Sequence, residues 1–204
     1  MIRQVATSKP LKLNLAGLVT SQSLDYILSG LKNNAVVHEL NLSDNLLNDE
    51  DLTKICQRLR QQPSESVALK RLKLHSNEFR EPWPFLDLLN DCSSHYTHLN
   101  FSNMVFSSPE SIQMLSSAIT SLKNIQELAM CGLDMFGTSP DQAAPKVVVL
   151  FSSIGQLRSL RCLDLSKNKL PTQVCLKMIE TMPRLPRLQT LVLSQVNLTD
   201  AVVS

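Results

Sequence analysis

Glycine, aromatic residues and long apolar runs are all scarce in this sequence. Five glycines among 204 residues leave no glycine-rich loop of the kind that cradles phosphate groups. Aromatic residues make up 4% of the chain and hydrophobic residues 43%, so the core is expected to be aliphatic. The longest apolar run, 147–151, ends at two serines and is far shorter than the roughly 18 residues that span a bilayer. The first ten residues hold no apolar stretch long enough for a secretory signal.

Charge and cysteine content narrow the class of protein further. The net charge is +2 with both signs interspersed, which does not predict a nucleic-acid footprint. The five cysteines are an odd number without close pairing, whereas disulfide scaffolds are usually smaller and richer in cysteine. We therefore expect a cytoplasmic or otherwise intracellular protein that contacts neither nucleic acid nor membrane.

A repeated strand pattern runs through the chain. Seven times, two large apolar residues stand two positions apart, usually as Leu-x-Leu. The first residues of these pairs lie 27 to 35 residues apart, at Leu13, Leu40, Leu72, Leu99, Leu128, Leu163 and Leu191. A period near thirty residues is typical of a stacked solenoid. Each copy predicts a strand with one buried face.

An asparagine follows the strand in the clearest copies, at Asn45, Asn77 and Asn168. At that point the chain must turn sharply, and a side-chain amide can bond backbone groups that would otherwise lack partners. Three other copies have Met104, Leu133 and Val196 there, and the first copy is the most irregular. We expect an incomplete asparagine ladder with some looser turns.

The second half of each unit predicts a helix with one buried face. Six apolar quartets follow the i, i+3, i+4, i+7 spacing, beginning at Leu24, Leu52, Phe85, Ile112, Val147 and Cys175. The last of them includes Ile179. Residues 137–145 and 63–66 are surplus to the repeat and are expected to be loops. Asn48 or Asp49, Ser108 and Pro171 are expected at helix starts.

These residues resemble the leucine-rich repeat superfamily, and the long units resemble its ribonuclease-inhibitor-like class. The resemblance implies an α/β fold: a right-handed, horseshoe-shaped solenoid of about seven strand–helix repeats, with a parallel sheet on the concave face. Residues 1–204 would form one domain, with 1–10 as a possible N-terminal cap and 194–204 as an incomplete last repeat. Partners of this class usually bind the concave sheet and the adjoining loops, but its members have many unrelated functions.

Residues between the buried leucines are expected to face a protein partner. These concave-face candidates are Glu39, Asn41, Arg71, Lys73, His75, His98, Asn100, Glu127 and Asp164. Arg71, Lys73 and His75 beside His98 form the densest positive spot, which suits an acidic segment, although exposed strand positions must be polar in any case. Trp83, Phe136 and Asp141 are candidate loop contacts. Trp83, between two prolines, packs locally or contacts a partner.

No pattern in the sequence predicts chemistry. His95 and His98 would point to opposite faces of a strand, so no metal site is expected, and no cofactor or catalytic residue is predicted. The sequence favours a non-catalytic protein–protein interaction module. The alternatives are a regulator of an enzyme, such as a GTPase-activating protein of the Ran-activating type, and a structural arm of a larger assembly. The C-terminal end lacks a polar cap, which leaves self-association or contact with an adjacent chain open.

Overall fold

The computed structural model describes residues 10–31, 36–61, 68–92, 94–106, 108–135 and 140–196, without the side chains of 140–142. Strands and helices alternate along these residues. The strands are β1 (Leu11–Asn14), β2 (Val37–Asn41), β3 (Arg71–Lys73), β4 (His98–Asn100), β5 (Glu127–Ala129), β6 (Cys162–Asp164) and β7 (Thr190–Val192). The helices are α1 (Ser21–Gly30), α2 (Asp49–Arg60), α3 (Trp83–Cys92), α4 (Pro109–Ser121), α5 (Pro140–Ile154) and α6 (Thr172–Thr181), which a short 3-10 helix, η2 (Met182–Arg184), follows.

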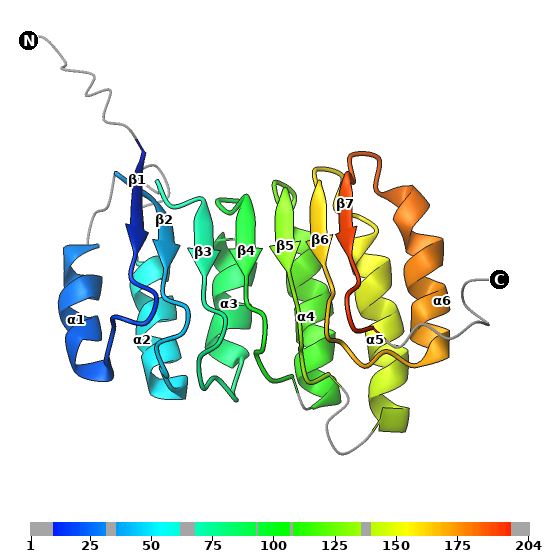
Figure 1. The fold of residues 1–204 in the computed structure, drawn as a ribbon, viewed down its shortest axis with the longest axis horizontal. Helices are drawn as coiled ribbons and strands as arrows, with labels where there is room; N and C mark the ends of the chain where they lie inside the picture. Colours follow the sequence, from blue (N-terminus) through cyan, green and yellow to red (C-terminus); the bar gives the residue numbers. More distant parts are fainter. Residues whose placement is uncertain are drawn as a thin grey trace, which may run out of the picture.

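The seven strands form one parallel sheet in the order of the chain, from β1 to β7. Figure 1 shows the helices in a row along one face of this sheet. The register aligns the first leucine of every pair, from Leu13 in β1 to Leu191 in β7. The predicted alternation of strands and helices and the predicted register of the leucines are therefore confirmed.

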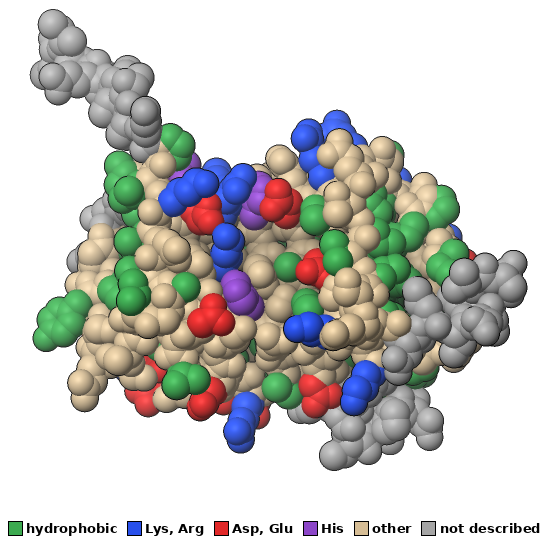
Figure 2. Space-filling view, viewed as in Figure 1, with side chains coloured by type: hydrophobic (Ala, Val, Ile, Leu, Met, Phe, Trp, Pro, Cys, Tyr) green, Lys and Arg blue, Asp and Glu red, His purple; other side chains and the backbone are tan. Residues whose placement is uncertain are grey.

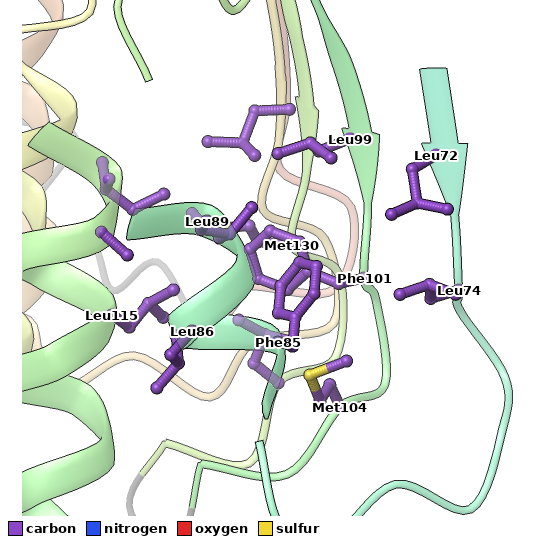
Figure 3. Packing of buried hydrophobic residues seen from close by; sticks show 14 of the residues in the cluster. Leu72, Leu74, Phe85, Leu86, Leu89, Leu99, Phe101, Met104, Leu115 and Met130 are labelled. Carbon is purple, nitrogen blue, oxygen red and sulfur yellow. The ribbon is translucent and has the colours of Figure 1, made fainter. Parts of the chain in front are cut away.

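The core lies between the sheet and the helix row. Leucines of the inner strands, such as Leu40 and Leu163, have no exposed surface, whereas Leu13 and Leu191 in the outer strands are only partly buried. Figure 3 shows leucines of β3 and β4 beside the side chains of α3. The rings of Phe85 and Phe101 pack there with centroids 5.1 Å apart, so the few aromatic residues gather in the middle of the chain.

The asparagines bond the backbone as expected. Asn168 is fully buried, accepts a hydrogen bond from the backbone N–H of Leu133 and donates to the carbonyl oxygens of Met130 and Leu165. Asn77 likewise accepts from the N–H of Leu47. Each of these amides joins its own turn to the turn before it, so the ladder holds neighbouring units together.

A left-handed residue follows every strand. The fourth residue after each first leucine has a φ between 55° and 68°, at Gly17, Asp44, Ser76, Asn103, Gly132, Lys167 and Gln195. The backbone N–H of Gly132 donates to Ser166 in the next unit, and that of Lys167 donates to Ser194. All seven turns therefore share one backbone geometry, although only two of them have glycine.

Two helices depart from the sequence prediction, α5 in where it begins and α6 in which residues it buries. Residues 137–145 were expected to be a loop, but α5 begins at Pro140 and includes Pro145. Pro145 is the sixth residue of α5, where its ring cannot donate to the carbonyl group four residues earlier and crowds that group. The helix nevertheless continues through it and buries Ala143. In α6, Ile179 was expected on the buried face but is 44% exposed. The buried residues of α6 are Val174, Cys175, Met178 and Thr181.

The structure confirms two of the predicted helix caps. Asn48 caps α2 and Ser108 caps α4 through side-chain hydrogen bonds to backbone N–H groups, and Pro109 occupies the first turn of α4. Pro171 precedes the first residue of α6 and makes no side-chain cap bond. The expectations for residues 1–9, 63–66 and 197–204 lie outside the described residues.

Candidate functional site

We call the side of the sheet opposite the helices the open face. Two rows of side chains cross it beside the buried leucines. The first row contains Lys12, Glu39, Arg71, His98, Glu127, Cys162 and Thr190. The second row contains Asn14, Asn41, Lys73, Asn100, Ala129, Asp164 and Val192. Figure 2 shows basic, acidic and histidine side chains gathered on this face.

Glu39 is the centre of an ion cluster. Its carboxylate lies 2.9 Å from Nζ of Lys73, 3.6 Å from Nζ of Lys12 and 3.9 Å from a guanidinium nitrogen of Arg71. The hydrogen bond from Lys73 and the three positive charges hold the pKa of Glu39 below its usual value, against the opposing effect of burial. The side chain of Glu39 is only 12% exposed, whereas those of its partners are 40% exposed or more.

This geometry shows that the predicted positive spot is partly neutralised by the chain itself. Arg71 and Lys73 face a carboxylate of the chain itself, in the neighbouring strand β2. Both keep a large exposed fraction and a free side toward solvent. The spot therefore offers two partly compensated cations, and a ligand must compete with Glu39 for them.

The histidines of the open face contribute little positive charge at neutral pH. Nε2 of His98 lies 3.1 Å from a carboxylate oxygen of Glu127, and Nε2 of His75 lies 3.9 Å from one of Asp44. Burial lowers the pKa of both histidines below the ordinary value, and this effect outweighs the carboxylate beside each ring. Nδ1 of His98 also lies 2.8 Å from the hydroxyl oxygen of Thr97, so both ring nitrogens of His98 have partners within the chain, and a ligand would have to displace one of them.

Several residues of the second row have a role within the fold. Oδ1 of Asn41, of Asn100 and of Asp164 each accepts from the backbone N–H two residues further on, at distances of 2.9 to 3.1 Å. These bonds stabilise the turn that follows each strand. Polar residues at these three positions are thus explained by the backbone, and they become binding candidates only through their remaining polar atoms.

A hollow of about 200 Å³ lies in the middle of the open face, over β3 to β7. Polar groups of Lys73, His98 and Glu127 line it on one side. The side chains of Ala129, Cys162 and Val192 line it on the other, together with the carboxylate of Asp164, which stands between Ala129 and Val192. The hollow can accept a short side chain that has an apolar body and a polar end.

The structure places most of the predicted site residues together. All nine predicted open-face residues lie on β2 to β6 or in the turn after β3, and five of them line the hollow. Trp83 lies apart at the start of α3, where it is half-buried against the core and its Nε1 donates to Glu81. Phe136 lies outside the described residues, and so does the side chain of Asp141 in α5.

Sequence reasoning missed two charged residues of the site. Lys12 belongs to the most irregular copy of the repeat, so its position beside Glu39 was not apparent. Asp44 follows β2, in the left-handed turn position, and its carboxylate lies 3.9 Å from Nε2 of His75 in the next unit. Counting residues from the first leucine of each pair would have found both. Lys12 stands one residue before Leu13, and Asp44 stands four residues after Leu40.

Three properties of the described residues concern metal binding, thiol reactivity and membranes. No group of three or more potential metal ligands was found among them. Burial raises the pKa of the Cys131 and Cys162 thiols, which disfavours the reactive thiolate. Within the described part of the chain, no helix has both the length and the apolar character to cross a membrane.

A scan against protein-family models and a search of curated proteins found no match for this chain. The proposals that follow therefore rest on the sequence and the structure alone.

Proposed function

We propose that this chain is a leucine-rich-repeat solenoid of the ribonuclease-inhibitor-like class and works as a non-catalytic protein-binding module. Three features support the assignment to that class: the thirty-residue period, the sequential parallel sheet with helices on one side, and the asparagine ladder. A parallel sheet is normally covered on both faces. Here the helices lie along one face only, and the open face is the surface offered to a partner.

The observation that carries the functional proposal is the composition of the open face. Its two rows hold as many carboxylates as lysine and arginine side chains, and a hollow with an apolar wall lies next to them. Such a mixture of charged and apolar groups is typical of surfaces that recognise proteins. Electrostatic complementarity would set the orientation of the partner, and the hollow would hold an anchoring side chain.

The expected partner is a protein segment with an acidic side chain and a small apolar anchor. The acidic side chain would bind Arg71 and Lys73 on the side that Glu39 leaves free. The anchor would enter the hollow between Ala129 and Val192. Free thiols at buried helix positions, such as Cys56 and Cys175, support an intracellular location for this partnership.

An affinity capture with mass spectrometry tests the proposal. The wild-type chain is compared with Arg71→Gln/Lys73→Gln, with Ala129→Lys, which fills the hollow, and with Arg58→Gln/Lys146→Gln, which changes the same charges on α2 and α5. A genuine partner is retained by the helix variant and is lost from both open-face variants. Retention by all variants, each shown by circular dichroism to be folded, would refute binding through the open face. Stimulated nucleotide hydrolysis by a captured GTPase would instead favour the enzyme-regulator alternative.

A further inference from the structure

A second concave site lies at the edge of the sheet where the strands begin. It is a pocket of about 380 Å³ lined by side chains of the loops that lead from the helices into β3 to β7. Its lining contains Lys70, His95, Arg161 and Arg187 and no carboxylate; the other lining residues are Ser94, Thr97, Asn124, Gln126 and Ser159. The open face and this pocket share no lining residue, so the pocket is a separate site.

The repeat builds this pocket from two rows. Lys70, Thr97, Gln126 and Arg161 stand directly before successive strands, and backbone hydrogen bonds of 2.7 to 2.9 Å connect each to the next. A second row, two residues earlier in each unit, contains His95, Asn124, Ser159 and Arg187. The amide of Asn124 donates to the carbonyl oxygen of Ser94, which fixes the wall on that side.

The charges lie at the two ends of the pocket. Lys70 and His95 come from the units at one end, and Arg161 and Arg187 come from those at the other. Hydroxyl and amide groups occupy the middle. Neighbouring parallel strands are about 4.8 Å apart, so three strand spacings separate the backbones of Lys70 and Arg161 by about 14 Å. Both side chains are long enough to reach well into that interval.

The cations of this pocket are Lys70, Arg161 and Arg187. In the residues that the structure describes, Lys70, Arg161 and Arg187 form no salt bridge, in contrast to Arg71 and Lys73 on the open face. Nδ1 of His95 is shielded from solvent and has no hydrogen-bond partner there. Figure 2 shows lysine and arginine side chains gathered at this edge of the molecule, above β5 to β7.

From this arrangement we propose that the pocket binds a small organic anion with two separated phosphate groups. Arg161 and Arg187 would hold one phosphate, since guanidinium groups match the geometry of phosphate oxygens. Lys70 would hold the other phosphate, and the neutral imidazole of His95 would donate a hydrogen bond to it. The side-chain amides of Gln126 and Asn124 would donate to hydroxyl groups of the spacer between the phosphates. The hydroxyl of Thr97 already bonds Lys70 and His98. The volume of the pocket lies in the range of small-molecule sites. This inference does not depend on the protein partner proposed for the open face.

Isothermal titration calorimetry with fructose bisphosphate, fructose monophosphate and inorganic phosphate tests the proposal at constant ionic strength. The bisphosphate is expected to bind at least about tenfold more tightly than the monophosphate, because the second phosphate meets the charge of Lys70. Lys70→Gln is expected to remove that difference and leave binding of the monophosphate unchanged. Arg161→Gln/Arg187→Gln is expected to weaken both sugar phosphates by about tenfold or more.

Arg80→Gln/Lys169→Gln is the matched control, because both side chains lie after their strands, at the opposite edge of the sheet. The ring resonances of His95, followed by NMR, report whether the ligand occupies this pocket. Equal affinity for bisphosphate and monophosphate would overturn the proposal. So would an equal loss of binding in the control variant, or no shift of the His95 resonances at saturation. Absence of measurable binding by fructose bisphosphate would overturn it as well.

Discussion

At the scale of single residues, the left-handed position after each strand is the most regular feature of the chain. Seven different units place φ near 60° at that position, yet five of the seven residues are not glycine. A side chain there costs roughly 1–2 kcal/mol relative to ordinary backbone. The fold tolerates the cost because the N–H of the residue donates to the next unit, as that of Lys167 does to the carbonyl oxygen of Ser194.

Gly132→Ala tests this view directly. We expect it to lower the free energy of unfolding by about 1–2 kcal/mol, because the new Cβ meets a positive φ. The same Cβ would lie 2.6 Å from Oδ1 of Asn103, whose side chain must turn away. Gly30→Ala is the control, because its Cβ would meet no atom within 4 Å. Urea unfolding measures both, and equal stabilities of the two variants would contradict the prediction.

The buried amide of Asn168 supports a second prediction at this scale. Asn168→Ala leaves the N–H of Leu133 and the carbonyl oxygens of Met130 and Leu165 without their partner. We expect a loss of about 2–4 kcal/mol in urea unfolding, because unsatisfied buried groups retain their full desolvation cost. Asn124→Ala removes one bond of an exposed amide and should change stability by less than about 1 kcal/mol. A similar small effect at Asn168 would show that the ladder does not hold the units together.

At the scale of the elements, periodicity predicts the strands and the helix faces well and the boundaries less well. The first leucines predicted every strand, because a one-residue slip would expose the whole apolar row. The loop expected over 137–145 was wrong from Pro140 onward, because the proline and glycine content of a segment does not exclude a helix that continues through Pro145, its sixth residue. The asparagine ladder was predictable from its spacing, whereas the shared left-handed φ leaves no common residue type in the sequence.

The last helix shows where periodicity misleads. Both Met178 and Ile179 fit an apolar quartet, but the packing of α6 buries Met178 and leaves Ile179 at 44% exposure. Met178→Ala should therefore destabilise the protein by about 2–5 kcal/mol, the usual cost of a buried truncation. Ile179→Ala should change stability by no more than about 0.5 kcal/mol. Thermal unfolding followed by circular dichroism compares them, and a larger loss at Ile179 would restore the original assignment of the buried face.

At the scale of the whole molecule, the candidate site depends on contacts between units that no single unit reveals. Glu39 and Arg71 are 32 residues apart in the chain and lie side by side only through the sheet register. The sequence predicted both residues as site candidates but not their pairing, which turns a positive spot into a compensated cluster. The same register explains why Asn41, Asn100 and Asp164 recur: they close the strand ends.

These inter-unit contacts also make stability depend on pH in two separate windows. The pKa of His75, His95 and His98 is lowered below 6.5, chiefly by burial, so the unfolded chain takes up these protons more readily than the folded one. Their contribution to stability is present above pH 6.5 and declines as the pH falls below that value. The pKa of Glu39 is lowered below 4.5, chiefly through Lys73, so its contribution declines only as the pH falls below 4.5.

Urea unfolding at a series of pH values should therefore show the midpoint declining first below pH 6.5 and again below pH 4.5. His98→Gln keeps a polar side chain but removes one proton-binding group, so it should reduce the first decline and leave the second. Glu39→Gln should remove the second decline, and it should change the first only through the small effect of the Glu39 charge on the pKa of His98. It should also lower stability at neutral pH, because Lys12, Arg71 and Lys73 lose their shared carboxylate. A single decline that both variants alter equally would mean that the two clusters do not titrate independently, against the separate ion contacts that the sheet register creates.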